Sequence, residues 1–243
     1  AAGPDPNAGA LKRALAVGQQ VEHLDSVPAE LLPADASRDF GQILPPETLA
    51  VLGKATDAQY AELGREVAAR RSFQVPTLGA FERITEMHRP FDDMLSEPDA
   101  GYVAPWIVDQ WRARRKSLSD NGFGPAEDEG MNAVRNRLVK AFHEAGVQMM
   151  AGSDTPHPFH VWGFGLIREI EALSGAGLGP MAALRTATVV PRNYFRSLPN
   201  QGSALGWKAD FGTVETGARG ILLLLDADPS RDLAALKRIR ALV

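Results

Sequence analysis

The sequence predicts an α/β fold with parallel strands, and three observations support this prediction. Short apolar segments at residues 20–24, 73–78 and 147–151 have the length and composition of buried strands. Residues 57–71 and 127–145 lie between them and repeat apolar side chains at helical spacing. Strand, helix and strand therefore alternate along the chain, which is typical of parallel strands joined by helical crossovers.

Local patterns predict the elements around the first two strands. Residues 8–16 place small, apolar and basic side chains at helical spacing and lead into the first strand, whereas residues 28–46 are rich in loop signals. Asp57 is a plausible N-cap for the helix at 57–71. Pro76 would disfavour a central strand, but it fits near the end of the second strand.

The connection over residues 82–130 is too long for a simple loop. We expect it to contain a short helix over residues 105–117. An insertion of this kind between barrel elements usually covers the mouth of the site. The helix at 127–145 carries one apolar stripe, formed by Met131, Val134, Leu138 and Phe142. Gly146 is a suitable residue to end that helix.

Three helices are expected after the third strand. The first covers residues 164–174, the second runs from Pro180 to residue 188, and a third short one opens at Pro191. The rhythm of strand and helix seen earlier in the chain is therefore broken here.

The C-terminal part predicts a small second layer. Residues 212–214 and 221–225 have the pattern of two β segments around a turn, and residues 232–242 have that of a closing helix. Since this β pair lies outside the barrel rhythm, we predict two parts. The first is residues 1–198 with the insertion described above, and the second is residues 199–243.

The composition argues against several classes of function. The chain has 243 residues and a formal net charge of −4, whereas nucleic acid binding needs a concentrated basic surface. Its one basic run, residues 112–116, has the spacing of a solvated helix face, with a phosphate patch as the alternative. The lack of cysteine excludes disulfides, thiolate metal sites and a thiol nucleophile. No apolar run reaches the roughly 18 residues of a membrane span.

Asp154 and His23 are the main candidates for chemistry. Asp154 ends the third strand and precedes a loop rich in proline and histidine, and His23 ends the first strand. In a βα-barrel the C-terminal strand ends carry the catalytic residues. A histidine and an aspartate on separate strand ends suit a metal-assisted hydrolase. Two structural alternatives stay open, namely a hydrogen-bonded structural histidine and an N-cap aspartate.

The remaining histidines carry weaker signals. His157 and His160 lie just past Asp154, where a role in the site and a surface position are both open. His143 falls in a last helical turn, where a cation suits the helix dipole, and His88 lies in the insertion as an expected exposed loop residue. No nucleophile elbow, dinucleotide-binding fingerprint or P-loop occurs.

The C-terminal half resembles one enzyme family. Residues 152–159, 163–173 and 176–188 are similar to the eighth strand and following helices of the amidohydrolase superfamily, with its imidazolonepropionase-like and prolidase-like branch as the nearest match. Residues 212–219 and 222–229 resemble the family's C-terminal return into a β-sandwich.

The resemblance extends to the first half of the chain. Residues 21–23 look like the family's sixth strand with its histidine, and residues 75–78 resemble its seventh strand. Tyr102, with Pro105 and Trp111 after it, is similar to a family segment over the site. The resemblance thus implies the C-terminal part of a TIM-like (β/α)8 barrel, followed by strands of a small β-sandwich.

The resemblance also implies a mechanism and a substrate class. One or two divalent metal ions, most often zinc, would lie at the barrel mouth with His23 and Asp154 as ligands. Asp154 would also be the general base that takes a proton from water and passes it to the leaving amine. Tyr102 and His157 would bind the substrate, an amide or dipeptide with a free carboxylate.

Three departures from the family pattern matter. The family's first-strand His-x-His pair, fourth-strand lysine and fifth-strand histidine have no match in this chain. Gly220-Ile221 replaces a common Ala-Asp, and Ile167 replaces a common histidine. Since catalytic zinc takes about three protein ligands, we expect the chain to be the C-terminal portion of a longer hydrolase, with its N-terminal portion as a partner.

Two other classes of function compete with a metal-dependent amide hydrolase. One is a non-catalytic amidohydrolase-like protein that binds a small molecule or a partner. The other is a metal-free barrel lyase or aldolase, which would need a strand-end lysine and a glycine-rich phosphate loop. Substrate identity, the number of metal ions, the compartment and a homo-oligomeric state stay open.

Overall fold

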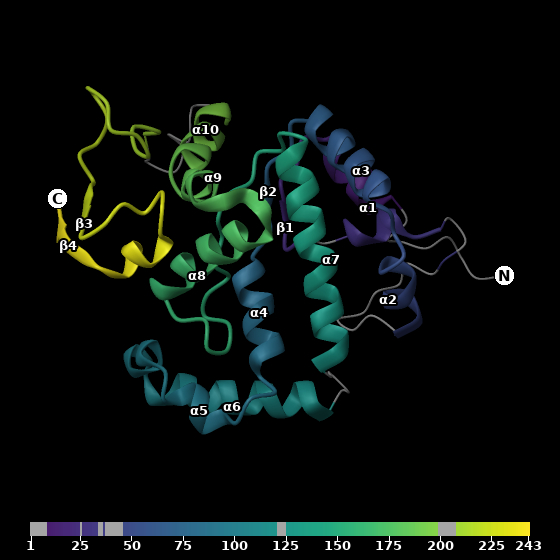
Figure 1. Ribbon diagram of the computed structural model, residues 1–243, viewed down its shortest axis with the longest axis horizontal. Coiled ribbons are helices and arrows are strands. Elements are labelled where there is room, and N and C mark those ends of the chain that lie inside the picture. Colours follow the sequence, from purple (N-terminus) through teal and green to yellow (C-terminus); the bar gives the residue numbers. More distant parts are fainter. Residues whose placement is uncertain (1–8, 25, 34–35, 37–45, 121–124, 199–207) are drawn as a thin grey trace.

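The structure is a computed structural model that describes residues 9–24, 26–33, 36, 46–120, 125–198 and 208–243. Most of these residues are helical, and the strands are short (Figure 1). Asp25 and most of the predicted loop at 28–46 lie outside the described residues. The described chain holds no helix that combines the length and apolar character needed to cross a membrane.

Three parallel segments form the centre of the fold. β1 (Val21–Glu22) pairs with β2 (Gln74–Val75), with Val21 opposite Gln74. On its other side β2 bridges Met149 in parallel. The Gln74 N–H donates to the Gln148 carbonyl at 3.0 Å, and the Met150 N–H donates back to the Gln74 carbonyl at 2.9 Å. β2 is therefore the middle member of the three.

The α/β prediction is confirmed in its coarse form. The three predicted strands do align in parallel, but they are only two residues long or a single bridge. Pro76 directly follows β2, and α4 (Leu78–Glu86) begins two residues later, so the predicted strand at 73–78 ends early. The described residues do not close into a barrel, and the complete barrel stays a prediction.

The main core lies between the central segments and the helices that cover them. α7 (Pro125–Glu144) packs against α3 (Asp57–Ala69), and Gly64 allows their close approach because a Cβ there would lie 2.8 Å from the Ala141 carbonyl oxygen. The N-cap of α3 is Thr56, in a capping box with Gln59, so the prediction that Asp57 is the N-cap was one residue late. The predicted apolar stripe of α7 faces this core.

The N-terminal elements pack on the same side as α3 (Figure 1). They are α1 (Ala10–Ala16), the 3₁₀ turn η1 (Pro28–Leu31) and α2 (Pro46–Leu52). Their buried side chains join the main core, among them Leu11, Leu15, Leu31 and Leu52.

The insertion forms a separate small core. After α4 it contains α5 (Phe91–Leu95), the 3₁₀ turn η2 (Pro98–Tyr102) and α6 (Pro105–Asp120), so the expected helix at 105–117 is present and slightly longer. Six buried apolar residues from the insertion and from the loop after Asp154 pack together: Met87, Met94, Ile107, Trp111, Phe159 and Val161. The insertion is thereby attached to the Asp154 loop.

The helices predicted after the third strand are present. They are α8 (Phe164–Leu173), α9 (Gly179–Thr186) and α10 (Val189–Ser197), with the π-helical turn η3 (Ser174–Leu178) between the first two. Pro180 lies in the first turn of α9, as expected from its fixed φ and missing N–H.

The predicted closing helix at 232–242 was wrong. The segment forms the 3₁₀ turn η5 (Leu233–Lys237) and then β4 (Ile239–Leu242), which pairs antiparallel with β3 (Leu223–Leu225). The backbone groups of the apolar run at 221–225 need hydrogen-bond partners. Pairing of β4 with this run outweighs the helix propensity of residues 232–242. Residues 212–214 are not a strand. The boundary at 198/199 borders a stretch outside the described residues and stays a prediction.

Candidate functional site

Parallel pairing brings His23 and Thr77 together. His23 follows β1, and its N–H donates to the Val75 carbonyl at 2.8 Å, which continues the ladder by one residue. Thr77 follows β2 and is buried. The His23 Nδ1 atom lies 2.9 Å from the Thr77 hydroxyl oxygen, so one ring nitrogen is held by a hydrogen bond. The other ring nitrogen, Nε2, makes no hydrogen bond to any part of the chain that the structure describes.

Asp154 follows the third parallel segment and reaches the same edge. Its side chain is exposed, and its backbone has a positive φ of 50°. No hydrogen bond or ion pair to another described residue engages its carboxylate, while its carbonyl accepts the His157 N–H at 3.2 Å. The predicted alternative of a capping aspartate is therefore not what the side chain does.

Electrostatic effects on Glu22 show that His23 and Asp154 share one neighbourhood. Partial burial raises the pKa of the Glu22 carboxyl, the charge of His23 lowers it, and the charge of Asp154 raises it. The charges of both predicted site residues therefore act on the Glu22 carboxyl, which lies at the end of β1.

His157 belongs to the same group. Burial lowers the pKa of His157, Asp154 raises it, and the charges of Arg114 and His23 lower it. Its Nδ1 atom is buried without a hydrogen-bond partner in the described chain. The neutral imidazole is favoured there, because burial disfavours the charged form.

The insertion approaches this site through α6. The Trp111 ring lies 4.8 Å from the Phe159 ring, two residues after His157. Arg114 is three residues further along α6, on the same helix face as Trp111, and its side chain is exposed. Tyr102 ends η2 and is 75% exposed, with its ring 5.2 Å from that of Phe164. Its predicted contact with substrate is not tested by the structure and stays a prediction.

His160 is buried, which removes a surface position from the alternatives left open for it. Both of its ring nitrogens lack a hydrogen-bond partner among the described residues. Burial, together with the charges of Arg168, Arg83 and His157, lowers the pKa of His160 to about 4. Its ring lies between α4 and α8, where a Cβ at Gly79 or at Gly165 would meet it. His88 is exposed, and His143 lies in the last turn of α7, as expected.

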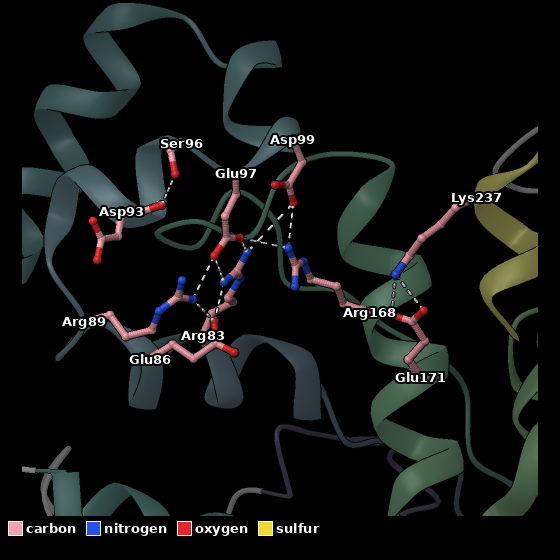
Figure 2. A network of polar contacts seen from close by, with 10 residues as sticks. All are labelled: Arg83, Glu86, Arg89, Asp93, Ser96, Glu97, Asp99, Arg168, Glu171 and Lys237. Carbon is pink, nitrogen blue, oxygen red and sulfur yellow. Dashed lines mark hydrogen bonds and ion pairs between the residues drawn. The ribbon is translucent and has the colours of Figure 1, made fainter.

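A network of charged residues anchors the insertion to α4 and α8 (Figure 2). Arg83 of α4 is 2% exposed and donates to Glu86 and Glu97. Arg168 of α8 donates to Asp99 at 2.9 Å and to Glu97 at 3.2 Å. Burial raises the pKa of Glu97, but the hydrogen bond and charge of Arg83, together with Arg89 and Arg168, outweigh it and lower the pKa to about 2. The turn that leads to Tyr102 is therefore held by ionised side chains.

Sequence reasoning missed three contributors to this region. Thr77 could have been noticed as a threonine that follows a strand and precedes an apolar helix, which is a common N-cap signal. Glu169 lies four residues after Gly165 and four before Leu173, so it is a charged residue on the buried face of a predicted helix. Arg83 gives no comparable signal, because its burial depends on acids from the distant insertion.

The donors available for a metal ion are incomplete within the described chain. His23 Nε2 and the Asp154 carboxylate have the chemistry of zinc ligands. No group of three or more His, Cys, Asp or Glu side chains that could hold a metal ion occurs among the described residues. These two donors would form only part of a zinc shell, because a catalytic zinc takes about three protein ligands.

Comparison with known proteins points to one superfamily. No protein-family model matches the chain, and no curated protein matches it. Among solved structures, a bottromycin amidohydrolase aligns with 96% of this chain and 46% of its own, at 25% sequence identity and a TM-score of 0.56. This likeness supports membership of the amidohydrolase superfamily.

Other solved structures from the same comparison are more distant. A Xaa-Pro dipeptidase with methionine bound in its active site shares 16% identity over 96% of this chain and 40% of its own, with a TM-score of 0.48. A further amidohydrolase shares 18% identity over 100% of this chain and 57% of its own, with a TM-score of 0.45. The chain spans between 40% and 57% of the length of these three structures.

The charged network predicts a pH-dependent contribution to stability. Glu97 has a folded-state pKa of about 2, below the ordinary 4.5, so its contribution is present above pH 4.5 and is lost as the pH falls towards 2. Glu97→Gln should lower the free energy of unfolding at pH 7 by roughly 1–3 kcal/mol and flatten its decline below pH 4.5. Urea unfolding at pH 7, 4.5 and 3 measures both effects. Glu62→Gln, at an exposed position of α3, is the control, and equal curves for the two variants would contradict the prediction.

Proposed function

We propose that the protein is a metal-dependent hydrolase of amide bonds, and that this chain forms its C-terminal portion. The observation that carries the proposal is the gathering of His23, Asp154 and His157 at one edge of the parallel segments. Superfamily membership agrees with it, and the aligned bottromycin protein is itself named an amidohydrolase.

The roles of the two donors follow from their surroundings. His23 would bind a divalent ion through Nε2, because its Nδ1 is occupied by Thr77. Asp154 would be the second ligand, since its carboxylate is exposed and otherwise unengaged by described residues. A zinc-class ion supplies a nucleophilic water at neutral pH and polarises the scissile carbonyl. Asp154 would accept the proton of the attacking water and transfer it to the leaving amine.

The remaining ligands would come from an N-terminal portion of the same protein. The donors in the described chain are two, whereas a catalytic zinc takes about three. The chain also spans 46% of the aligned bottromycin amidohydrolase, which leaves room for further barrel strands. Those strands would cover the edges of β1 and of the third parallel segment. Uncovered, these edges would present unpaired backbone groups that favour aggregation.

The substrate would carry a free carboxylate. Arg114 lies on the face of α6 that approaches the Asp154 loop, and its charge is close enough to lower the pKa of His157. No ion pair to another described residue neutralises it. A substrate carboxylate bound by Arg114 would place the amide bond towards Asp154, with neutral His157 and the exposed Tyr102 ring as neighbouring contacts. Dipeptides and N-acyl amino acids have this chemistry.

The mechanism predicts that Asp154→Asn abolishes hydrolysis while the fold is kept. The amide has the shape of the carboxylate but cannot take up the proton. Hydrolysis of an N-acyl amino acid would be assayed together with thermal unfolding, and Asp93→Asn on the distant α5 is the control. Substantial turnover by the Asp154 variant would remove Asp154 from the role of base.

Substitution of Arg114 tests whether this residue binds the substrate carboxylate. Arg114→Ala should raise KM for an N-acyl amino acid roughly 10–100-fold, the equivalent of one charge-assisted hydrogen bond, with a smaller change in kcat. The same variant should barely affect the corresponding methyl ester, which lacks the charge. Arg112→Ala on the same helix is the control. An equal loss on acid and ester would show that Arg114 does not bind the carboxylate.

Native mass spectrometry of the purified protein tests the assembly. We expect a second polypeptide and one or two zinc-sized ions to accompany the 26.2 kDa chain. Detection of the chain alone and without metal would contradict the hydrolase proposal. The non-catalytic binding protein would then be the better interpretation.

A further inference from the structure

Thr77 occupies the N-cap position of α4 without capping it. A threonine there usually accepts a hydrogen bond from the N–H of the second or third helical residue. Thr77 makes no such bond and has a positive φ of 52°. Its hydroxyl is instead 2.9 Å from His23 Nδ1. The first N–H groups of α4 therefore need another acceptor.

Glu169 of α8 provides that acceptor. Gly79 is the second residue of α4, and its N–H donates to Glu169 Oε2 at 2.7 Å. Glu169 is 0% exposed and comes from a helix far away in the sequence. The N-terminus of α4 is thus capped by a side chain from another helix, through a tertiary hydrogen bond.

The surrounding packing is shaped to admit this contact. A Cβ at Gly79 would lie 3.2 Å from the Glu169 backbone nitrogen and 3.0 Å from His160 Cε1. A side chain at position 79 would therefore require α8 or the His160 ring to shift by a few tenths of an ångström. Glycine at this position allows the close approach of the two helices without such a shift.

The chemistry of the cap does not depend on a full charge. Burial outweighs the N–H groups of Gly79, Leu78 and Thr77, which lower the pKa of Glu169, and the net effect raises this pKa to about 8. A carboxylate and a neutral carboxyl group both present an oxygen that accepts the Gly79 N–H. Glutamine presents one as well, so it preserves the cap without the charge.

We propose that Glu169 is a positioning residue for His23. It caps α4 in place of Thr77, and this leaves the Thr77 hydroxyl to hold the His23 ring. With Nδ1 protonated and bound to Thr77, Nε2 keeps its lone pair and points away from the hydrogen bond. The consequence for metal affinity rests on the proposed function, whereas the orientation of the ring does not.

The test varies the length and the charge of the side chain at position 169 separately, in the full protein. Glu169→Gln keeps the length and an acceptor oxygen, whereas Glu169→Asp keeps the charge but is one methylene shorter. Glu169→Leu removes the acceptor altogether, and Thr77→Val removes the hydroxyl.

The His23 tautomer is measured by ¹H–¹⁵N long-range correlation spectra of metal-free, ¹⁵N-histidine-labelled protein, with His23 assigned from the signals lost in His23→Asn. Zinc affinity is measured separately by calorimetric titration with zinc chloride.

The expected pattern separates positioning from stability. The wild type and Glu169→Gln should show one tautomer, protonated at Nδ1. Glu169→Asp, Glu169→Leu and Thr77→Val should show a mixture of tautomers and bind zinc roughly 10–100-fold more weakly. Adding Glu169→Leu to Thr77→Val should cause no further loss of zinc affinity, because both act through the same hydroxyl.

Other results would overturn the proposal. A lowered thermal midpoint in Glu169→Asp or Glu169→Leu with an unchanged His23 tautomer would make Glu169 a structural cap only. If Glu169→Leu does not fold, the pair of Asp and Gln variants decides the question alone. Absence of zinc binding by the wild type would contradict the proposed function, while the tautomer measurement would still judge the positioning of His23.

Discussion

The parallel hydrogen bonding of three short segments decides where the functional side chains lie. The backbone of residues 73–75 is hydrogen-bonded to residues 21–23 on one side and to residues 148–150 on the other, at 2.8–3.1 Å. Because parallel strands end at the same edge, the residues after each segment must meet there. His23, Thr77 and the loop that begins at Asp154 are those residues. Few backbone bonds are involved, so the helices packed around them must keep the segments in register.

α4 is held to α8 at both of its ends by polar side chains. At its N-terminus Glu169 accepts the Gly79 N–H, and at its C-terminal half Arg83 joins Arg168 through Glu97 and Asp99. A buried ionic network is weak evidence for stability, because desolvation offsets much of the attraction. Its geometry does specify one arrangement of α4, α8 and the insertion. The same arrangement places α6, with Trp111 and Arg114, next to the loop that carries His157.

The sequence predicted the order of elements better than their ends. Periodicity is a strong signal for long helices, and α3 and α7 appeared where the apolar stripes indicated. The strands were overestimated because an apolar run such as 73–78 does not reveal where a helix begins. The segment at 232–242 was predicted to be a helix from its local propensity alone. Its pairing with residues 223–225 is a contact between separate segments, which local propensity does not reflect.

The candidate site was predictable to a similar degree. His23, Asp154 and His157 could be found because each follows an apolar segment or lies beside one in sequence. Thr77, Glu169 and Arg83 act through contacts between distant elements, and a single sequence does not show such contacts. Sequence patterns thus pointed to the candidate groups for the chemistry, whereas the polar contacts around them became visible only in the structure.

Backbone conformation links the site to the rest of the fold. His23, Thr77 and Asp154 all have positive φ angles, between 50° and 59°. Side chains other than glycine adopt this region at a cost of order 1–3 kcal/mol each, and such residues persist only where the surroundings determine them. Here the ladder determines His23, the cap from Glu169 accompanies Thr77, and the attachment of Phe159 to the insertion restrains the loop after Asp154. Three strand ends that meet at one edge therefore carry backbone strain, and each is supported from a different part of the chain.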